Sequence, residues 1–339
     1  MTRKERVLNA FCHKASDIIP YHADFTKQKF NNIVADTNDV DFTEKLGLHL
    51  YYTQYWGWPT KIPERLEHFK DDFGVIWNRS GPDKDIGVVD TPIFETPDIS
   101  LWREPKIDEL RLRAEYQEII DTREDRFTAP GIGFSMFERA WSLCGIENIL
   151  VYMIEEPTFV HELLDAICDY NIKIINIANE YPFDGFYFGD DWGQQRGLIM
   201  GQKFWREFIK PRMKRMYEQA RKNGRFVMQH SCGDNMELFP DLIEIGLSCY
   251  QTFQPEIYDI KKVKTEFGKD LSFWGGISTQ QLLVNATPDE VKRETVRIMQ
   301  TMCAGGGYIA APTHAIPGDV SPENIFAMLD VFMNQDKYF

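Results

Sequence analysis

The sequence RFVMQHSCGD at residues 225–234 places a strand-like apolar run directly before a polar loop that contains glycine. A strand is predicted at 225–228, after a helix at 202–223 and before a helix at 236–245. When strands and helices alternate in this way many times, the strands form a parallel sheet. The stretch therefore indicates one repeating unit of an α/β fold.

The same alternation extends from residue 126 almost to the end of the chain. Strands are predicted at 126–132, 185–188, 225–228, 249–252, 271–274 and 308–311, and helices at 137–154, 157–180, 202–223, 236–245, 257–267, 288–303 and 321–334. An open doubly wound sheet would carry a glycine-rich phosphate loop after an early strand, whereas the run Gly305–Gly307 precedes a strand. We therefore expect a single (β/α)8 TIM-type barrel over residues 1–339.

The first 125 residues are less regular. Thr2 followed by Glu5 forms a capping-box pattern at the start of a helix over 2–11, and a first strand is expected at 17–25. Residues 26–125 are interpreted as barrel elements that carry an inserted hairpin, and the range of about 40–125 is expected to be an irregular insertion. Its elements are expected as helical pieces near 37–47 and 108–120 and as strands at 74–77 and 86–89, joined by a turn at Ser80-Gly81-Pro82.

Composition excludes several classes of protein. The 339 residues carry a net charge of -14, from 52 acidic and 38 basic side chains, whereas a nucleic-acid binder is expected to have a basic face. The six cysteines are widely and irregularly spaced, which favours free thiols in a reducing compartment. The N-terminus lacks the apolar core of a signal peptide, and no apolar run is long enough to span a membrane. We expect a cytoplasmic protein without nucleic-acid or membrane partners.

Polar residues gather where the predicted strands end. In a parallel barrel, functional residues lie in the loops that leave the carboxyl ends of the strands. Here those loops are Gly189–Trp192, Gln229–Asp234, Phe253–Glu256, Gly275–Ser278 and Pro312–His314. The loops at the opposite ends carry plain helix stops such as Asn223-Gly224. This asymmetry predicts a functional site at the carboxyl ends of the strands.

His230 and Cys232 form the most specific pattern. Residues two apart on an extended backbone point to the same side, so one imidazole nitrogen and one thiolate can meet the same ion. Zinc accepts nitrogen and sulfur ligands of this kind. His314, from a later strand, would add a third ligand and leave the open coordination position typical of catalytic zinc. The alternatives are a packed histidine beside an inert thiol, and a loop histidine bonded to a backbone carbonyl.

Further candidates flank this set. Asp190 and Asp191 are adjacent, so at most one faces the barrel centre as a ligand or general base, and the other is free to cap a turn. Glu138 is a candidate catalytic acid, or else an ordinary helix residue. The substrate-binding candidates are His22, Gln254, Gly275 and Gly276. The two glycines are expected where backbone approaches a ligand closely. The aromatic stretch 51–58 suits a core, a subunit interface or a substrate wall.

Several motifs resemble the uroporphyrinogen decarboxylase superfamily, especially its corrinoid-dependent methyltransferase branch. They are Arg3–Leu8 with Asp17–Pro20, Phe137–Trp141, Gly189–Gly193, His230–Gly233, Phe273–Ile277 and Gly305–Ile309 with Pro322–Ile325. The resemblance implies a (β/α)8 barrel in which zinc is held by His-x-Cys and a later cysteine in a Pro-Gly-Cys turn. His230 and Cys232 match the first pair, and His314 stands where the second cysteine would be.

Three functions remain open from the sequence. The first is a zinc-dependent methyltransferase that moves a methyl group from a small donor, such as a methoxy compound, to a corrinoid protein. A zinc ion with one thiolate and two imidazoles is harder than one with two thiolates, and it suits polarisation of an oxygen atom. The second is a decarboxylase, although the segment 21–26 lacks the arginines that grip a porphyrinogen's carboxylates. The third is a non-catalytic barrel that binds a small molecule.

Overall fold

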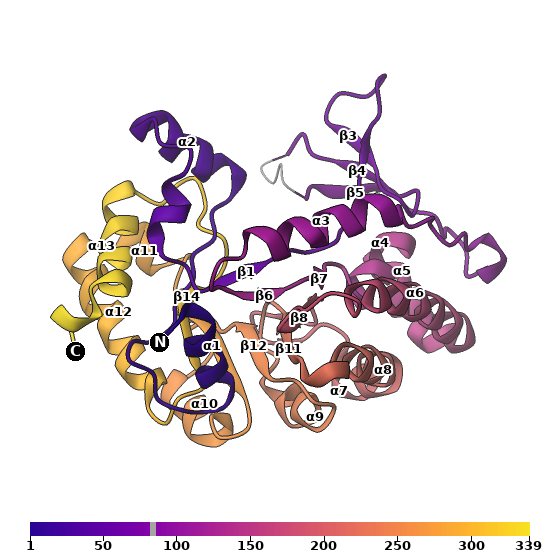
Figure 1. The fold of residues 1–339 in the computed structure, drawn as a ribbon. Helices are drawn as coiled ribbons and strands as arrows, with labels where there is room; N and C mark the ends of the chain where they lie inside the picture. The colour runs from indigo at the N-terminus through magenta and orange to yellow at the C-terminus, as the bar shows by residue number, and fades with distance from the viewer. Residues whose placement is uncertain (82–85) are drawn as a thin grey trace.

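Parallel strands close into a barrel in the computed structural model, which describes residues 1–81 and 86–339 (Figure 1). Six strands form one sheet in the order β14-β13-β12-β11-β8-β7. Their bounds are β7 Gly131–Ile132, β8 Gly185–Gly189, β11 Phe226–His230, β12 Cys249–Thr252, β13 Ser272–Ile277 and β14 Tyr308–Pro312. Every pairing in this sheet is parallel, as the alternation of strands and helices predicted.

Two further segments complete the circle. β1 (Leu50–Tyr52) pairs in parallel with β6 (Phe127–Ala129), which continues past Pro130 into β7. Tyr21 bridges Ala310 of β14 in parallel, and its carbonyl oxygen accepts a hydrogen bond from the His49 amide at 3.1 Å. The strand expected at 17–25 is therefore reduced to bridges at Tyr21 and Phe25, but it occupies the first position of the barrel.

The inside of the barrel is a packed apolar core. Leu50, Phe127, Ala129, Tyr187, Met228, Cys249, Trp274, Ile309 and Ala311 belong to one buried cluster. Helix α1 (Arg3–Phe11) adds Val7, Ala10 and Phe11 to the same cluster, so it closes the amino-terminal end of the barrel. The predicted capping box of α1 is confirmed, because Thr2 accepts from the Glu5 amide while the Glu5 side chain accepts from the Thr2 amide.

The outer helices surround the strands, with α6 and α8 on one side in Figure 1 and α12 and α13 on the other. Their bounds are α4 Phe137–Cys144, α5 Ile146–Glu155, α6 Pro157–Ala178, α7 Gly201–Phe204, α8 Lys210–Ala220, α9 Phe239–Glu244, α10 Ile260–Phe267, α11 Leu282–Asn285, α12 Pro288–Cys303 and α13 Pro322–Met333. The helix predicted at 137–154 is split because Gly145 has a φ of 87°. The helix predicted at 202–223 is interrupted by a π-helical turn at Trp205–Ile209.

The irregular region combines barrel elements with inserted segments. The range 40–125 contains two barrel elements, β1 and the helix α3 (Glu109–Thr122). The helical piece expected near 37–47 is present only as a short 3-10 helix at Phe42–Leu46. A longer helix that the sequence analysis missed, α2 (Lys27–Thr37), ends just before it with Asn38 in the left-handed conformation. The signal for α2 was Thr26, whose side chain caps the helix by accepting from the Lys29 amide.

An antiparallel sheet projects from the barrel within this region (Figure 1). Its order is β2-β3-β4-β5, with bounds Thr60–Lys61, His68–Lys70, Ile76–Asn78 and Val88–Thr91. The predicted hairpin is confirmed as the antiparallel pair of β4 and β5, and it is half of a larger sheet. Pro82 of the predicted turn lies outside the described residues.

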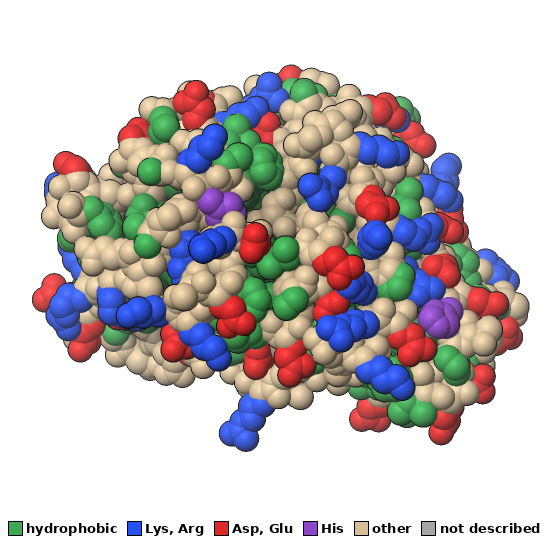
Figure 2. All heavy atoms as spheres, turned by 90° about the horizontal axis from the view of Figure 1, so that it is seen from below, with side chains coloured by type: hydrophobic (Ala, Val, Ile, Leu, Met, Phe, Trp, Pro, Cys, Tyr) green, Lys and Arg blue, Asp and Glu red, His purple; other side chains and the backbone are tan. Residues whose placement is uncertain are grey.

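Figure 2 shows one face of the molecule, on which acidic and basic side chains alternate without a continuous basic area. All six cysteines carry free thiols. In the described part of the chain, none of the helices combines the length and the apolar character that crossing a bilayer requires.

Removing the aromatic ring that α1 contributes to the barrel core should destabilise the protein. Phe11 contacts Phe127 and Phe226 at ring-centroid distances of 5.3 and 5.1 Å. We expect Phe11→Ala to lower the free energy of unfolding by about 3 kcal/mol, measured by urea denaturation, because a cavity is left at the barrel floor. Cys12→Ser, at the exposed next position, should change it by less than about 0.5 kcal/mol. Equal effects of the two substitutions would show that α1 does not seal the barrel.

Candidate metal centre

Three side chains from two loops converge at the mouth of the barrel. His230 is the last residue of β11 and points inward in phase with Met228, and Cys232 follows two residues later. His314 lies two residues after the end of β14. One ligand atom from each of the three residues lies within 4.8 Å of the other two. No other such group of His, Cys, Asp and Glu is found within residues 1–81 and 86–339.

The spacing of these atoms fits a tetrahedral ion. Cys232 Sγ lies 3.6 Å from His230 Nε2. Zinc bonds of roughly 2.3 Å to sulfur and roughly 2.1 Å to nitrogen at a tetrahedral angle give an S···N edge of about 3.6 Å. The His230 and His314 rings are 5.6 Å apart between centroids. These two residues and Cys232 would therefore need little rearrangement to hold zinc.

A buried network orients the His230 ring. Its Nδ1 bonds Gln251 Oε1, and the Tyr187 hydroxyl donates to the same oxygen at 3.0 Å. Since Gln251 Oε1 can only accept, Nδ1 is assigned as the protonated nitrogen, and Nε2 presents its lone pair to the centre. A hydrogen bond from the second ring nitrogen is the usual device that fixes a metal-binding histidine.

The surroundings of Cys232 and His314 disfavour the charged forms of both side chains. Burial and the nearby carboxylates of Asp191 and Glu138 raise the pKa of the Cys232 thiol. His314 is exposed towards the mouth, but the protein around it still desolvates the ring, and this desolvation and His230 together lower the pKa of His314. Cys232 must lose its proton to bind a metal, so metal binding at this centre should release a proton.

The two adjacent aspartates have different surroundings. Asp190 is completely buried, and its carboxylate accepts hydrogen bonds from the backbone amides of Met136, Phe137 and Glu138 and from the Trp192 indole. It therefore caps the amino-terminal end of α4, as the sequence analysis allowed for one of the two aspartates, and it does not line the cavity that Asp191 reaches. Burial raises the pKa of Asp190 to about 7, against the effect of these four donors.

Asp191 faces the candidate metal centre. Its Oδ1 accepts from the Cys232 amide at 2.7 Å and lies 3.5 Å from His230 Nε2. Glu138 follows the capped start of α4 and reaches the same cavity. Burial, followed by the charges of Asp191 and Asp190, raises the pKa of the Glu138 carboxyl well above its usual value. The pair thus combines an aspartate that contacts the candidate ligands with a buried glutamate whose pKa is raised.

A cavity of about 210 Å³ contains these groups. We call it the mouth cavity. Its lining residues are Asp24, Tyr52, Gln54, Trp56, Ile86, Phe134, Glu138, Tyr187, Gly189, Asp191, His230, Gln251, His314 and Ala315. Of these, Tyr52 and Tyr187 contact each other at a centroid distance of 4.9 Å and form an aromatic floor, and both contact the buried Trp274, at 5.2 and 5.4 Å. The aromatic stretch 51–58 thus supplies part of a wall, one of the three readings that the sequence left open.

Asp24 is a site residue that the sequence analysis missed. Burial opposes its ionisation, but His22 and the Tyr52 hydroxyl lower the pKa of Asp24. His22 Nε2 lies 3.1 Å from Asp24 Oδ1, so the histidine supports this carboxylate and does not line the mouth cavity itself. The available signal was position, because Asp24 lies at the carboxyl end of the first barrel segment.

The other predicted substrate-binding residues do not line the mouth cavity either. Gln254 is buried, and its side chain accepts from the Gly233 amide at 3.3 Å, which supports the loop that carries Cys232. Gly275 and Gly276 lie inside β13 and not after it, with φ values of 136° and 100°. A Cβ at Gly275 would meet the Thr252 carbonyl oxygen at 2.1 Å, so the close approach is to a neighbouring strand and not to a ligand.

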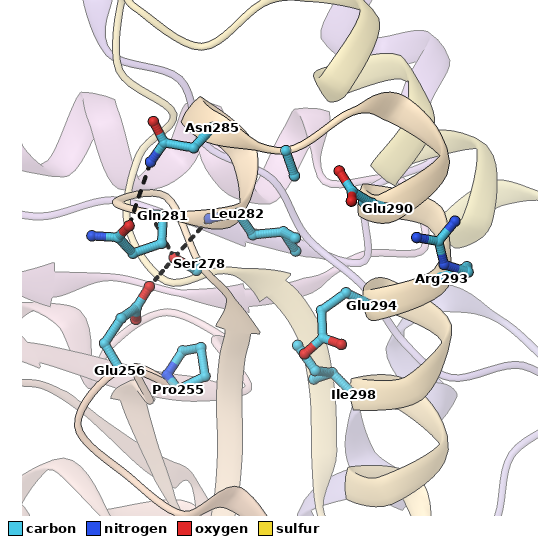
Figure 3. Close-up of a pocket in the computed structure, with 11 residues that line it drawn as sticks. Pro255, Glu256, Ser278, Gln281, Leu282, Asn285, Glu290, Arg293, Glu294 and Ile298 are labelled. Atoms are coloured by element: carbon cyan, nitrogen blue, oxygen red, sulfur yellow. Dashed lines mark hydrogen bonds between the residues drawn. The ribbon is translucent and has the colours of Figure 1, made fainter.

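A wider groove of about 590 Å³ lies at the barrel rim (Figure 3). Glu256 and Ser278 face the helix residues Glu290, Arg293 and Glu294 across it. Its polar groups bind one another: the Ser278 hydroxyl donates to Glu256, and it accepts from the Gln281 amide at 2.9 Å. Because the metal-capable trio lies in the mouth cavity, we assign the candidate site there and not to the larger groove.

Substituting the two aspartates should separate their roles. In Asp190→Asn, one carboxylate oxygen becomes an amide nitrogen that cannot accept, so two of the four N–H donors lose their acceptor. We expect a loss of about 2 kcal/mol in the free energy of unfolding, measured by urea denaturation. Asp191→Asn keeps an acceptor for the Cys232 amide and should cost less than about 1 kcal/mol. The reverse order would contradict the assignment of Asp190 to the helix.

Comparisons with known proteins agree with this architecture. The chain is 24% identical over 159 residues to a methylated-thiol–coenzyme M methyltransferase of Methanosarcina mazei, covering 47% of this chain and 41% of that protein. It is 23% identical over 217 residues to a uroporphyrinogen decarboxylase of Methylococcus capsulatus, covering 60% of this chain and 58% of that protein. The chain thus spans less than two thirds of the length of both relatives.

A solved structure of a methyltransferase from Methanosarcina mazei superimposes with a TM-score of 0.72 at 18% identity, covering 100% of both chains, and this likeness shows the fold. The family description "Uroporphyrinogen decarboxylase (URO-D)" matches residues 80–334. Because that match extends over most of its length, the chain belongs to the uroporphyrinogen decarboxylase family.

Proposed function

We propose that this protein is a zinc-dependent methyltransferase that passes a methyl group from a small donor to a corrinoid carried by a partner protein. The convergence of His230, Cys232 and His314 at the barrel mouth carries the proposal. The similarity to a methyltransferase of Methanosarcina mazei supports the reaction class.

The ligand set favours an oxygen-bound methyl group. Zinc held by one thiolate and two imidazoles would supply Lewis acidity that draws electrons from the atom bearing the methyl group. A second thiolate would make the ion softer and better suited to a thiol. With His314 in the third position, we infer a methoxy compound as the donor, in contrast to the thiol named for the Methanosarcina relative.

Residues of this chain would protonate the leaving group and shield it from water. The carbon–oxygen bond would break with its electron pair left on oxygen, and a reduced corrinoid on the partner would supply the electron pair for the new bond to the methyl carbon. Glu138 keeps its proton because burial and the neighbouring carboxylates raise its pKa, so it can donate that proton to the leaving oxygen. The aromatic floor of the mouth cavity excludes water from below.

Decarboxylation of a porphyrinogen is less well supported. A substrate with several carboxylates requires clustered arginines. Among the described residues that line the mouth cavity there is no lysine or arginine, and the segment after the first strand contributes Asp24 instead. The acidic residues Asp24 and Asp191 at the mouth would disfavour such a substrate.

Removing a ligand should remove the metal. We expect the purified protein to contain about one zinc ion per chain by elemental analysis, and Cys232→Ser and His314→Ala to hold it at least tenfold more weakly in a chelator competition, because each loses one of three ligands. Cys12→Ser and His68→Gln, which change the same residue types away from the mouth, should keep the metal. If none of the four substitutions changed the zinc content, the proposal would be wrong.

Glu138→Gln should separate chemistry from metal binding. We expect the variant to keep its zinc and its fold but to transfer methyl groups to a reduced corrinoid roughly 100-fold more slowly, because an amide cannot give a proton to the leaving oxygen. The visible spectrum of the corrinoid reports the transfer. A variant as fast as the wild type would remove Glu138 from the mechanism.

A further inference from the structure

A second cavity adjoins the mouth cavity. It has a volume of about 350 Å³ and lies between the projecting sheet and α4. It is lined by Trp56, Pro59, Asp71, Trp77, Arg79, Ile86, Phe134 and Arg139. Trp56, Ile86 and Phe134 line both cavities, so the two hollows meet along a shared, largely aromatic wall. A ligand bound at the metal end has a continuous apolar surface along which to extend.

Aromatic rings make up most of the shared wall. Trp56 lies 5.1 Å from Phe134 between ring centroids, and Trp77, in the second cavity, lies 5.4 Å from the same phenylalanine. Trp56 is 37% exposed, which is unusual for a tryptophan beside such partners and leaves ring surface open to a ligand. An aromatic body is the ligand chemistry that such a surface favours.

The charges of the two cavities are opposite in sign. The mouth cavity carries the carboxyl groups of Asp24, Glu138 and Asp191. The second cavity contains two arginines, and one is already neutralised: Arg139 is buried and pairs with the buried Asp71 at 2.7 Å. The positive charge that remains for a ligand in the second cavity belongs to Arg79.

Two contacts hold the Arg79 side chain, and neither of them neutralises its positive charge. Its Nε donates to the Ile86 carbonyl oxygen at 3.2 Å, and its guanidinium carbon lies 4.5 Å above the Phe69 ring. Within residues 1–81 and 86–339, no carboxylate forms an ion pair with it. A guanidinium fixed on one edge presents its other N–H groups in the fork that binds a carboxylate through two oxygens.

We propose that Arg79 of the projecting sheet binds an anionic group at the far end of the methyl donor. The donor is then an aromatic carboxylate whose methoxy group lies in the mouth cavity and whose ring lies on the shared wall. This inference rests on the proposed function for the direction of the substrate. It adds that the projecting sheet, rather than the barrel, selects the substrate.

Binding of two probes tests the assignment. Isothermal titration of the zinc-loaded full chain should show 4-methoxybenzoate binding at least tenfold more tightly than methoxybenzene, which lacks the carboxylate. In Arg79→Gln the affinity for 4-methoxybenzoate should fall about tenfold or more, while that for methoxybenzene should change less than twofold, because only the charged contact is lost. Arg79→Lys should fall between the two, since it keeps the charge without the fork.

The matched control is Lys61→Gln, which removes one positive charge from an exposed position of the same sheet. It should leave both affinities unchanged. Equal binding of the two probes by the wild type, or equal losses in the Arg79 and Lys61 variants, would overturn the inference.

The Arg79 assignment and the proposed methyltransferase function can fail independently of each other. If binding of 4-methoxybenzoate depends on Arg79 but no methyl group is transferred, the carboxylate site stands and the methyltransferase proposal falls. If zinc and methyl transfer are found while the carboxylate makes no difference to affinity, only the role of Arg79 falls.

Discussion

The parallel pairing of β8 with β11 sets the geometry of the site. It places His230 opposite Gly189, so the loop with Asp190 and Asp191 leaves the barrel beside the loop with Cys232. The Asp190 amide donates to the His230 carbonyl oxygen at 3.1 Å, and the Trp192 amide donates to the Ser231 hydroxyl at 3.0 Å. Because side chains alternate along a strand, a shift of one residue in this register would turn His230 to the outside of the barrel.

Other residues of the site orient the side chains that this strand pairing brings together. Gln251 on β12 fixes the His230 ring, and Asp191 accepts from the Cys232 amide, so both candidate ligands are held by residues that face the cavity without belonging to the trio. Asp190 does not face the cavity. It accepts hydrogen bonds from the start of α4 and thereby positions Glu138. The chemistry proposed at the mouth thus depends on hydrogen bonds that orient the candidate ligands and Glu138.

The sequence was most informative where local patterns repeat. After residue 126, apolar runs that end in polar loops predicted each barrel strand, and the helix expected at 288–303 is confirmed as α12. The alternation rule also predicted that only one of Asp190 and Asp191 faces the interior, but which of them does so depends on the distant start of α4. β1 was missed because its residues lie in an aromatic stretch without strand periodicity. Asp24 and Arg79 reach their cavities through contacts between distant segments, which no local pattern records.

Helix α1 also constrains how the barrel is made. Val7, Ala10 and Phe11 belong to a core whose other members include Trp274, Ile309 and Ala311, from the last two strands. α1 precedes those strands in the chain, so during synthesis it emerges from the ribosome long before its partners exist. Its apolar face must stay exposed, or be shielded by a chaperone, until the barrel closes above it. The barrel therefore cannot be completed until the last two strands have been synthesised. A truncated translation product would keep the apolar face of α1 exposed and would be prone to aggregate.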